Sequence, residues 1–413
     1  MPSDPWPRSE RTPPAEPPQR TLLLTFTGRD RPGVTSAVFD SLATFGIEVL
    51  DVEQVVLRGR LLLGVLVTAP RDHERLRSTV ETVARDLAMD VEIQVGAGDN
   101  EPRRRGRSHV TVLGHPLLPR AVAAIAGRIA DTGANIDRIT RIARYPVTAI
   151  ELDVSGSDPT KLRHTLAIEA AAQRVDVAVQ AAGLHRRAKR LVVLDVDSTL
   201  IQGEVIEMLA RRAGCLAEVS RLTTEAMHGQ LDFSESLRQR VALLAGLDEQ
   251  ALDDVRREIR LTPGARTLVR TLRRLGYQIG LVSGGFTQVV EPIAAELGID
   301  FVAANRLEVT EGTLTGRVDG EIIDRPGKAK ALREFAARAD VPLSQTVAIG
   351  DGANDLDMLD VAGLGVAFNA KPVVREAADT AVTVPYLDAI LYLLGITREE
   401  IEAADEEQRS IDS

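Results

Sequence analysis

Four short apolar runs, separated by segments long enough to form helices, constrain the fold of this chain more than any other feature. Continuous apolar runs of this length are typical of strands that are buried on both faces. Strands of this kind that alternate with helices form a parallel sheet. The C-terminal half is therefore predicted to be an α/β domain, with strands over residues 191–194, 279–282, 346–349 and 365–368.

A long stretch of helical character separates the first two of these strands. It covers about residues 205–262. Because it interrupts the sheet between its first and second strands, we expect it to form an inserted helical cap.

The N-terminal part contains an internal repeat in the order βαββαβ. The first copy opens with an apolar strand from Thr21, and its first helix ends at Gly46, a residue typical of helix C-termini. The first copy is predicted to have strands over residues 21–27, 48–57, 61–68 and 91–95, with one helix that ends at about residue 45 and another over 72–88. The second copy is predicted to have strands over residues 110–113, 135–142, 147–154 and 175–179, with helices over about 119–133 and 159–172.

These patterns divide the chain into segments. A proline-rich start is predicted to be a disordered leader, and an acidic end is expected to fray. The arginine-rich stretch between the two copies could be a nucleic-acid arm, but a solvated linker is the favoured interpretation. The predicted segments are 1–19 (leader), 20–97 (first copy), 108–182 (second copy), 190–397 (α/β domain, with its cap at about 205–262) and 398–413 (acidic tail).

Composition excludes several classes of protein. The formal net charge of −10 and the pI of about 5.3 argue against broad nucleic-acid binding. Cys215 is the only cysteine, so no intrachain disulfide can form and a reducing compartment is compatible. No apolar run approaches the roughly 18 residues of a membrane helix, and the start lacks a signal-peptide core. We therefore expect a cytoplasmic protein that contacts neither membranes nor nucleic acids.

Two carboxylates follow the first predicted strand of the α/β domain. Asp195 and Asp197 are two residues apart, so both can face one site if the chain turns there. Ligands bind at the C-terminal edge of an open parallel sheet, where Asp195 would lie. Taken alone, an acidic turn that closes a strand explains the pair as well as a catalytic site does.

Other polar groups follow the second and third strands. Ser283 and Gly284 end the second, where a hydroxyl and backbone N–H groups can contact a phosphate. Lys328 would add a positive charge, although a lone lysine is more often a surface residue. The third strand ends in Asp351, Asn354 and Asp355, whose hard oxygen atoms suit Mg²⁺.

In this order, the clusters resemble the four motifs of the haloacid dehalogenase superfamily, with Asp195, Asp197 and Thr199 forming the first motif. The resemblance implies a Rossmann-like core and, because the second aspartate is present, a phosphatase or mutase. Asp195 would be the nucleophile that forms an aspartyl-phosphate, and Asp197 the general acid and base. The implied contacts are Mg²⁺ at the carboxylates of Asp195 and Asp351 and the backbone carbonyl of Asp197; phosphoryl oxygens at Ser283, Gly284 and Lys328; and orienting roles for Asn354 and Asp355.

The run from Asp195 to Glu204 and the cap segment from Met227 to Arg240 resemble the phosphoserine phosphatase family. In that family Glu204 would bind the substrate ammonium and Arg240 its carboxylate, with Met227 and Phe233 closing over them. The implied reaction is hydrolysis of O-phospho-L-serine, the last step of L-serine biosynthesis. Plainer alternatives exist: Glu204 could cap a helix, Arg240 could pair with Glu235 or Glu204, and Arg238 and Lys330 are weaker rivals of Arg240 and Lys328.

The two repeat copies resemble tandem ACT domains, which are ferredoxin-like modules that often bind amino acids. The turn over residues 28–34 matches the ligand turn of that family, with Asp30 available to an ammonium and Gly33 allowing close backbone approach. The second copy lacks both features. The resemblance implies feedback binding of L-serine at the first copy and a homodimer built through these domains.

Two competing functions remain open at this point. One is a phosphatase or phosphomutase for another small metabolite, and the other is an amino-acid-sensing regulator that has kept an inactive phosphatase fold. Phosphoprotein substrates are also compatible with the motifs. The intact set of Asp195, Asp197, Ser283, Lys328 and Asp351 favours an enzyme.

Overall fold

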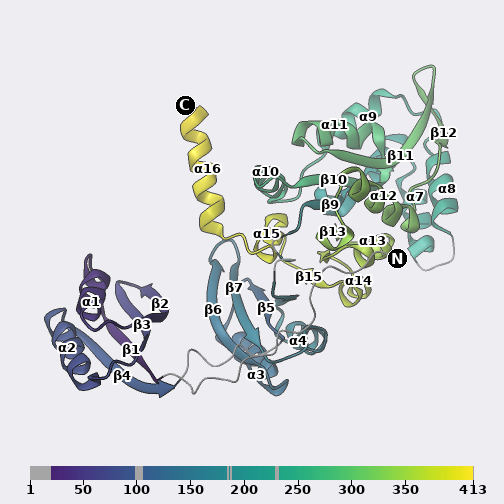
Figure 1. The fold of residues 1–413 in the computed structure, drawn as a ribbon. Helices are drawn as coiled ribbons and strands as arrows, with labels where there is room; N and C mark the ends of the chain where they lie inside the picture. The colour runs from purple at the N-terminus through teal and green to yellow at the C-terminus, as the bar shows by residue number, and fades with distance from the viewer. Residues whose placement is uncertain (1–19, 98–105, 184–185, 187, 228–231, 413) are drawn as a thin grey trace, which may run out of the picture. The chain divides into compact units, whose positions relative to one another are not determined.

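The computed structural model describes residues 20–97, 106–183, 186, 188–227 and 232–412, without the side chains of Met227 and of residues 407–412 (Figure 1). The predicted leader and most of the arginine-rich linker lie outside these residues. The chain divides into two compact units, residues 1–104 and 105–413.

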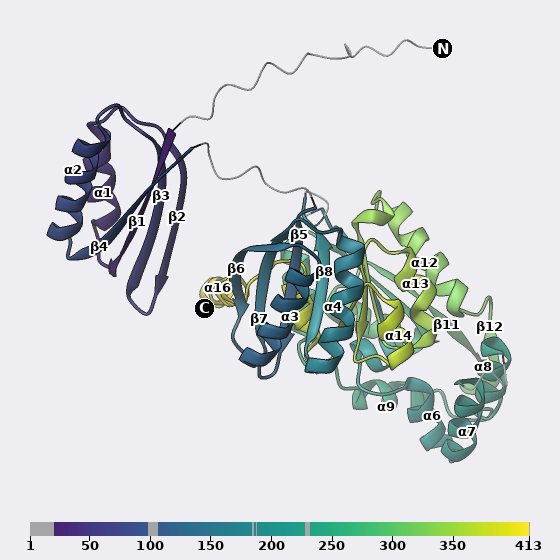
Figure 2. The same ribbon diagram turned by 90° about the horizontal axis from the view of Figure 1, so that it is seen from below.

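The first unit is a four-stranded antiparallel sheet in the order β2-β3-β1-β4, with both helices on one face (Figure 2). Alternate residues of β1 are buried under the helices, as its apolar alternation requires. Asp72 caps the second helix by accepting a hydrogen bond from the N–H of Arg75 at 3.1 Å. The elements are β1 (Arg20–Arg29), α1 (Val34–Ala43), β2 (Val49–Leu57), β3 (Arg60–Thr68), α2 (His73–Asp86) and β4 (Met89–Ala97).

The second unit begins with the second repeat copy, which has the same topology. Its sheet has the order β6-β7-β5-β8, and α3 and α4 cover one face. The βαββαβ prediction is thus confirmed for both copies. The elements are β5 (Ser108–Gly114), α3 (Pro119–Asp131), β6 (Asn135–Ala143), β7 (Thr148–Ser155), α4 (Pro159–Gln173) and β8 (Asp176–Ala181).

The predicted parallel sheet is also confirmed. Seven strands lie in the order β12-β11-β10-β9-β13-β14-β15, and all are parallel except β12, which runs antiparallel to β11. The strands are β9 (Leu191–Asp195), β10 (Gln278–Phe286), β11 (Phe301–Thr310), β12 (Thr313–Asp319), β13 (Thr346–Gly350), β14 (Gly365–Phe368) and β15 (Thr380–Val382).

Every residue of β9 is buried, because helices cover both faces of this sheet. Leu191 and Val193 pack on α12 and α13, whereas Val192 and Leu194 pack on the opposite face with α10 and α11. The helices are α10 (Ala265–Arg274), α11 (Thr287–Leu297), α12 (Arg325–Arg338), α13 (Leu356–Val361), α14 (Pro372–Ala377), α15 (Ile390–Leu393) and α16 (Arg398–Asp412). Within the described ranges, no helix is long and apolar enough to cross a membrane.

The helical cap leaves the core after β9 and a turn over Val196–Leu200. It returns at a bridge between Ile201 and Leu261, which ties the two crossing points together. Figure 2 shows its helices gathered beside β12, which packs against α8. The cap helices are α6 (Val205–Ala213), α7 (Leu216–Met227), α8 (Phe233–Ala242) and α9 (Gln250–Glu258).

The second repeat copy and the α/β domain share one apolar core, which contains Leu113 and Ala178 of the copy together with Leu194. Polar contacts also join them. Asp176 accepts hydrogen bonds from the N–H and the hydroxyl of Thr383 at 2.7 and 2.8 Å. These two predicted segments therefore form one compact unit.

The acidic end is a helix where we expected fraying. A reciprocal capping pair begins α16: the hydroxyl of Thr397 accepts from the N–H of Glu400 at 3.2 Å, and the Glu400 carboxylate accepts from the N–H of Thr397 at 2.7 Å. Ile401 is buried. Asp405 pairs with two arginines of α10. Capping, one apolar anchor and ion pairs thus order a segment whose composition alone indicated disorder.

Candidate active site

Three neighbouring strands bring the predicted catalytic groups together. Asp195 ends β9 and is paired in register with Val282 of β10, so Ser283 follows beside it. On the other side of β9, Leu194 pairs with Ile349 of β13, which places Asp351 just beyond the same edge. The C-terminal edge of the sheet therefore holds all three motif residues, as the sequence predicted from strand ends.

Lys328 joins two of the carboxylates from the first turns of α12. Its ammonium lies 2.6 Å from an oxygen of Asp195 and 2.6 Å from an oxygen of Asp355, and its side chain is completely buried. Burial lowers the pKa of Lys328, but the two carboxylates raise it further, so the pKa lies above its ordinary value. Lys330, the rival from the sequence, is exposed and pairs with Glu321 at 2.9 Å.

Asp197 faces the same site from the turn after β9. One of its carboxylate oxygens accepts the N–H of Val205 at 2.8 Å, and the other accepts the hydroxyl of Ser283 at 3.1 Å. Burial raises the pKa of Asp197, whereas these two hydrogen bonds oppose the rise, and the net direction is upward. A fixed carboxyl group with a raised pKa is suited to holding and transferring a proton.

A cluster of three aspartates, which we call the acidic group, lies around Lys328. Carboxylate oxygens of Asp195, Asp351 and Asp355 lie within 4.8 Å of one another. Burial and the charge of Asp355 raise the pKa of Asp351 to about 6, and the same two causes raise that of Asp195. Several carboxylates against one ammonium leave excess negative charge, and their hard oxygens fit a divalent cation such as Mg²⁺. Because Asp355 already accepts from Lys328 and from two backbone N–H groups, Asp195 and Asp351 are the freer ligands.

The C-terminal end of β10 has little room for larger residues. A Cβ atom on Gly285 would lie 2.8 Å from an oxygen of Asp197, and one on Gly284 would lie 3.2 Å from the ring of Phe233. The N–H of Gly285 donates to the hydroxyl of Ser283 at 2.8 Å. The cap thus contacts the predicted phosphate-binding loop through Phe233.

Glu204 lies just before α6, at the point where the chain enters the cap. The hydroxyl of Ser198 donates to its carboxylate at 3.0 Å. Burial and the charge of Asp197 raise the pKa of Glu204 to about 7. It makes no side-chain cap for α6, so the alternative of a helix-capping role does not hold.

Arg240 supplies the opposite charge from α8. Its side chain is buried, with one N–H 3.3 Å from the carbonyl oxygen of Ser236 and another 3.3 Å from the hydroxyl of Thr223. Burial lowers its pKa, while Glu204 and Asp197 act in the other direction. Arg238, the rival residue, is exposed and lines a different hollow.

The structure gives fewer side-chain contacts for the remaining predicted residues. Asn354 lies in the loop after β13, with its amide oxygen folded over Gly352. The side chain of Met227 lies outside the described atoms. Asp30 and Gly33 belong to the first unit, where Asp30 is exposed and Gly33 has a φ of 91°, a conformation that favours glycine.

Two side chains at the site were not predicted from the sequence. Ser198 has a φ of 58°, unusual for serine, and its hydroxyl holds Glu204. Thr223 contacts Arg240 from a neighbouring helix. Ser198 stands inside a predicted motif and could have been found there. No local pattern distinguishes Thr223 from the other hydroxyl residues of α7.

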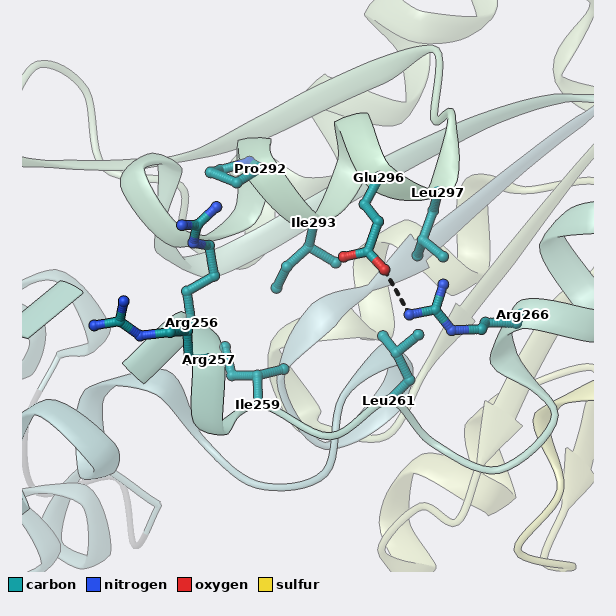
Figure 3. Close-up of a pocket in the computed structure, with 9 residues that line it drawn as sticks. All are labelled: Arg256, Arg257, Ile259, Leu261, Arg266, Pro292, Ile293, Glu296 and Leu297. Atoms are coloured by element: carbon teal, nitrogen blue, oxygen red, sulfur yellow. Dashed lines mark hydrogen bonds and ion pairs between the residues drawn. The ribbon is translucent and has the colours of Figure 1, made fainter. Parts of the chain in front are cut away.

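A cavity of about 400 Å³ lies apart from these residues, where the end of the cap meets α10 and α11. In Figure 3, Arg266 reaches across to Glu296, to which it pairs at 2.5 Å. None of the motif residues lines this cavity, so it is not the site described above. Its lining consists of Arg256, Arg257, Ile259, Leu261, Arg266, Pro292, Ile293, Glu296 and Leu297.

Family models match all three folded segments. Residues 192–360 match the haloacid dehalogenase-like hydrolase family. Residues 20–94 and 107–180 each match an ACT domain.

Relatives of known name cover nearly the whole chain. A phosphoserine phosphatase of Streptomyces coelicolor is 65% identical over 93% of this chain and 94% of its own length. A phosphoserine phosphatase of Mycobacterium tuberculosis is 55% identical over 93% of this chain and 95% of its own. Among solved structures, a probable phosphoserine phosphatase of Vibrio cholerae is similar with a TM-score of 0.56 and 33% identity, over 72% of this chain and 88% of its own.

Proposed function

Because the chain belongs to the phosphoserine phosphatase family of haloacid dehalogenase-like hydrolases, we propose that it hydrolyses O-phospho-L-serine to L-serine and inorganic phosphate. One observation carries the substrate assignment. The chain has a half-buried carboxylate, Glu204, held by Ser198 of the first motif, and a buried guanidinium, Arg240, on the cap, in addition to the buried Asp195–Lys328 pair. Phosphoserine has the complementary groups: an ammonium, a carboxylate and a phosphate.

The chemistry proposed for the chain has two displacements. A carboxylate oxygen of Asp195 attacks phosphorus, and the serine oxygen leaves as it takes a proton from Asp197. A water molecule then attacks the aspartyl-phosphate and gives its proton to Asp197, which releases inorganic phosphate and restores both carboxyl groups. The raised pKa of Asp197 supports its role as the proton carrier.

Charge neutralisation accompanies both displacements. Lys328, the hydroxyl of Ser283 and the N–H of Gly284 would bind the phosphoryl oxygens. Mg²⁺ fits the acidic group and would be held by the carboxylates of Asp195 and Asp351 and the backbone carbonyl of Asp197. When bound, it would offset the negative charge of the phosphoryl group. Asn354 and Asp355 would keep Lys328 and the substrate oriented.

Substrate recognition would come from the cap and its entry point. Glu204 would bind the ammonium and Arg240 the carboxylate, while Phe233 and Met227 cover the substrate. The position of the Phe233 ring, 3.2 Å from where a Cβ on Gly284 would lie, supports a closed arrangement of the cap.

A substrate panel tests this proposal. We expect O-phospho-L-serine to be hydrolysed with a kcat/KM about 100-fold or more above that of glucose 6-phosphate, because losing two charged partners costs several kcal/mol. Equal turnover of the two substrates would instead support a phosphatase for other metabolites.

We further propose that L-serine binds the first ACT domain near Asp30 and Gly33, and that the protein is a homodimer built through these domains. The edge strand β2 supports the dimer, because Val49, Val55 and Leu57 are exposed on it. Calorimetry of the full chain with L-serine should show binding that Asp30→Ala weakens, and sedimentation should give a dimer mass. If the Asp195→Asn variant shows no second binding site for L-serine, the proposal of serine binding is contradicted. A monomer at micromolar concentration would contradict the proposed dimer.

A further inference from the structure

Arg240 is a buried cation without an anionic partner in the part of the chain that the structure describes. Its exposed fraction is 8%, and its hydrogen bonds go to the carbonyl oxygen of Ser236 and the hydroxyl of Thr223. The carboxylates of Glu235 and Glu204, with which the sequence allowed ion pairs, instead accept from Gln239 and Ser198. Taking a guanidinium out of water is costly unless its N–H groups are hydrogen-bonded. Its geometry therefore depends on neutral groups of the cap.

Thr223 provides one of these neutral groups. Its hydroxyl donates to the carbonyl oxygen of Val219 at 2.9 Å, one turn earlier on α7, so its hydrogen is already used. The lone pairs of the same oxygen remain for Arg240, whose Nη1 lies at 3.3 Å. The second contact, from Nε to the carbonyl of Ser236, lies within α8 itself. Thr223 is thus the side chain that fixes the guanidinium relative to the neighbouring helix.

The remaining donors determine what this guanidinium can bind. Arginine has five N–H groups, and the two contacts use one at Nε and one at Nη1. Three are left, including both on Nη2, which is enough for two parallel hydrogen bonds to a carboxylate. Because the fork is planar, its binding direction follows from the two contacts already made.

We propose that Thr223 is a positioning residue that orients Arg240 toward the carboxylate of the substrate, and thereby sets the preference for an amino-acid phosphate. This inference rests on the proposed function. Without the hydroxyl, one buried N–H of Arg240 loses its acceptor and the guanidinium can rotate. Affinity for the carboxylate end then falls, while the groups around phosphorus stay in place.

Steady-state kinetics on two substrates tests the proposal. Thr223→Val removes the hydroxyl and keeps the shape of the side chain. We expect KM for O-phospho-L-serine to rise about tenfold with kcat within about twofold, because a binding contact and not a transition-state contact is lost. O-phosphoethanolamine, which has the ammonium and phosphate but no carboxylate, should show an unchanged KM. Thr223→Ser should restore the wild-type KM for phosphoserine.

The chain offers a matched control on the same helix. Thr224 makes an equivalent bond to the carbonyl of Ser220 at 2.9 Å but is exposed, so Thr224→Val should leave both substrates unaffected. Should Thr223→Val fail to fold, Thr223→Ala carries the same expectations.

Two results distinguish the possible failures. Suppose that the wild type hydrolyses phosphoserine, but Thr223→Val either keeps the wild-type KM for it or raises the KM for O-phosphoethanolamine by the same factor. The positioning role is then wrong and the proposed function stands. If the wild type does not hydrolyse phosphoserine, the proposed function fails and the positioning role fails with it.

Discussion

At the scale of single residues, the centre of the site is one buried ammonium between two carboxylates. Lys328 lies 2.6 Å from both Asp195 and Asp355, and all three side chains are shielded from water. Buried ion pairs of this kind contribute little when complete, but breaking one leaves an uncompensated charge. The lysine therefore determines both the charge of the site and the stability of its surroundings.

Replacing this lysine should affect stability and activity together. Lys328→Ala is expected to lower the free energy of unfolding by about 3–5 kcal/mol, because two carboxylates lose their buried partner. It should also reduce kcat by about 100-fold or more, because a cation next to phosphorus is removed. Lys330→Ala, on the exposed face of the same helix, is the control and should change neither. Urea denaturation and phosphate release measure the two effects; an active, stable Lys328→Ala protein would contradict them.

A second prediction concerns pH. The pKa of Glu204 is raised to about 7, so below that pH its carboxyl group is mainly protonated and cannot attract an ammonium. KM for phosphoserine should therefore fall as the pH rises through 7. Glu204→Gln should have a higher KM that does not fall over this pH range. Initial rates between pH 6 and 8 for both proteins provide the comparison. A parallel pH dependence in the variant would assign the titration to another group.

At the scale of elements, the strands carry the site, and the C-terminal end of β10 fits tightly against it. A Cβ on Gly285 would lie 2.8 Å from the Asp197 carboxylate, closer than such atoms approach, and 3.0 Å from the hydroxyl of Ser283, which is a tight contact. Gly285→Ala should therefore displace Asp197 and reduce kcat by about 10- to 100-fold, since small displacements of catalytic groups are costly. Gly127→Ala meets no atom within 4 Å and should retain full activity. Wild-type kcat in Gly285→Ala would show that this end of β10 can adjust.

The elements also show how far the sequence determines the fold. Apolar runs typical of strands buried on both faces predicted β9, β10, β13 and β14, and the polar residues at the ends of these strands predicted the site. The hairpin of β11 and β12 was missed because β11 is only half-buried and contains Asn305 and Arg306. The three-residue β15 has too few positions for a pattern. Thr223 could not be predicted, because its role comes from a contact between two helices and not from any sequence period.

At the scale of the whole molecule, the second ACT domain is part of the catalytic unit. Its edge strand β8 lies beside β15, the last strand of the catalytic sheet, and Arg163 pairs with Asp379 at 2.5 Å. The side chain of Gln180 donates to the carbonyl of Leu393 at 2.6 Å. With a common apolar core, these contacts indicate that residues 105–413 fold and unfold together.

One substitution at this junction tests that cooperativity. Asp176→Ala removes the buried carboxylate that accepts both polar hydrogens of Thr383 and should cost about 1–3 kcal/mol, because hydrogen bonds to a charged group contribute more than those between neutral groups. The transition of the unit monitored by activity and that monitored by circular dichroism should shift together. Asp131→Ala, at an exposed position of the same ACT domain, should shift neither. A shift of the circular dichroism transition without a shift of the activity transition would mean that the ACT domain and the α/β domain unfold independently.

The proposed function requires Asp195 and a divalent cation to hydrolyse phosphoserine at the edge of the parallel sheet. The most direct measurement is phosphate release from O-phospho-L-serine by the wild type and by Asp195→Asn, each with Mg²⁺ and after chelation. We expect release only by the wild type with Mg²⁺. Full Mg²⁺-dependent release by Asp195→Asn, or undiminished release by the chelated wild type, would contradict it.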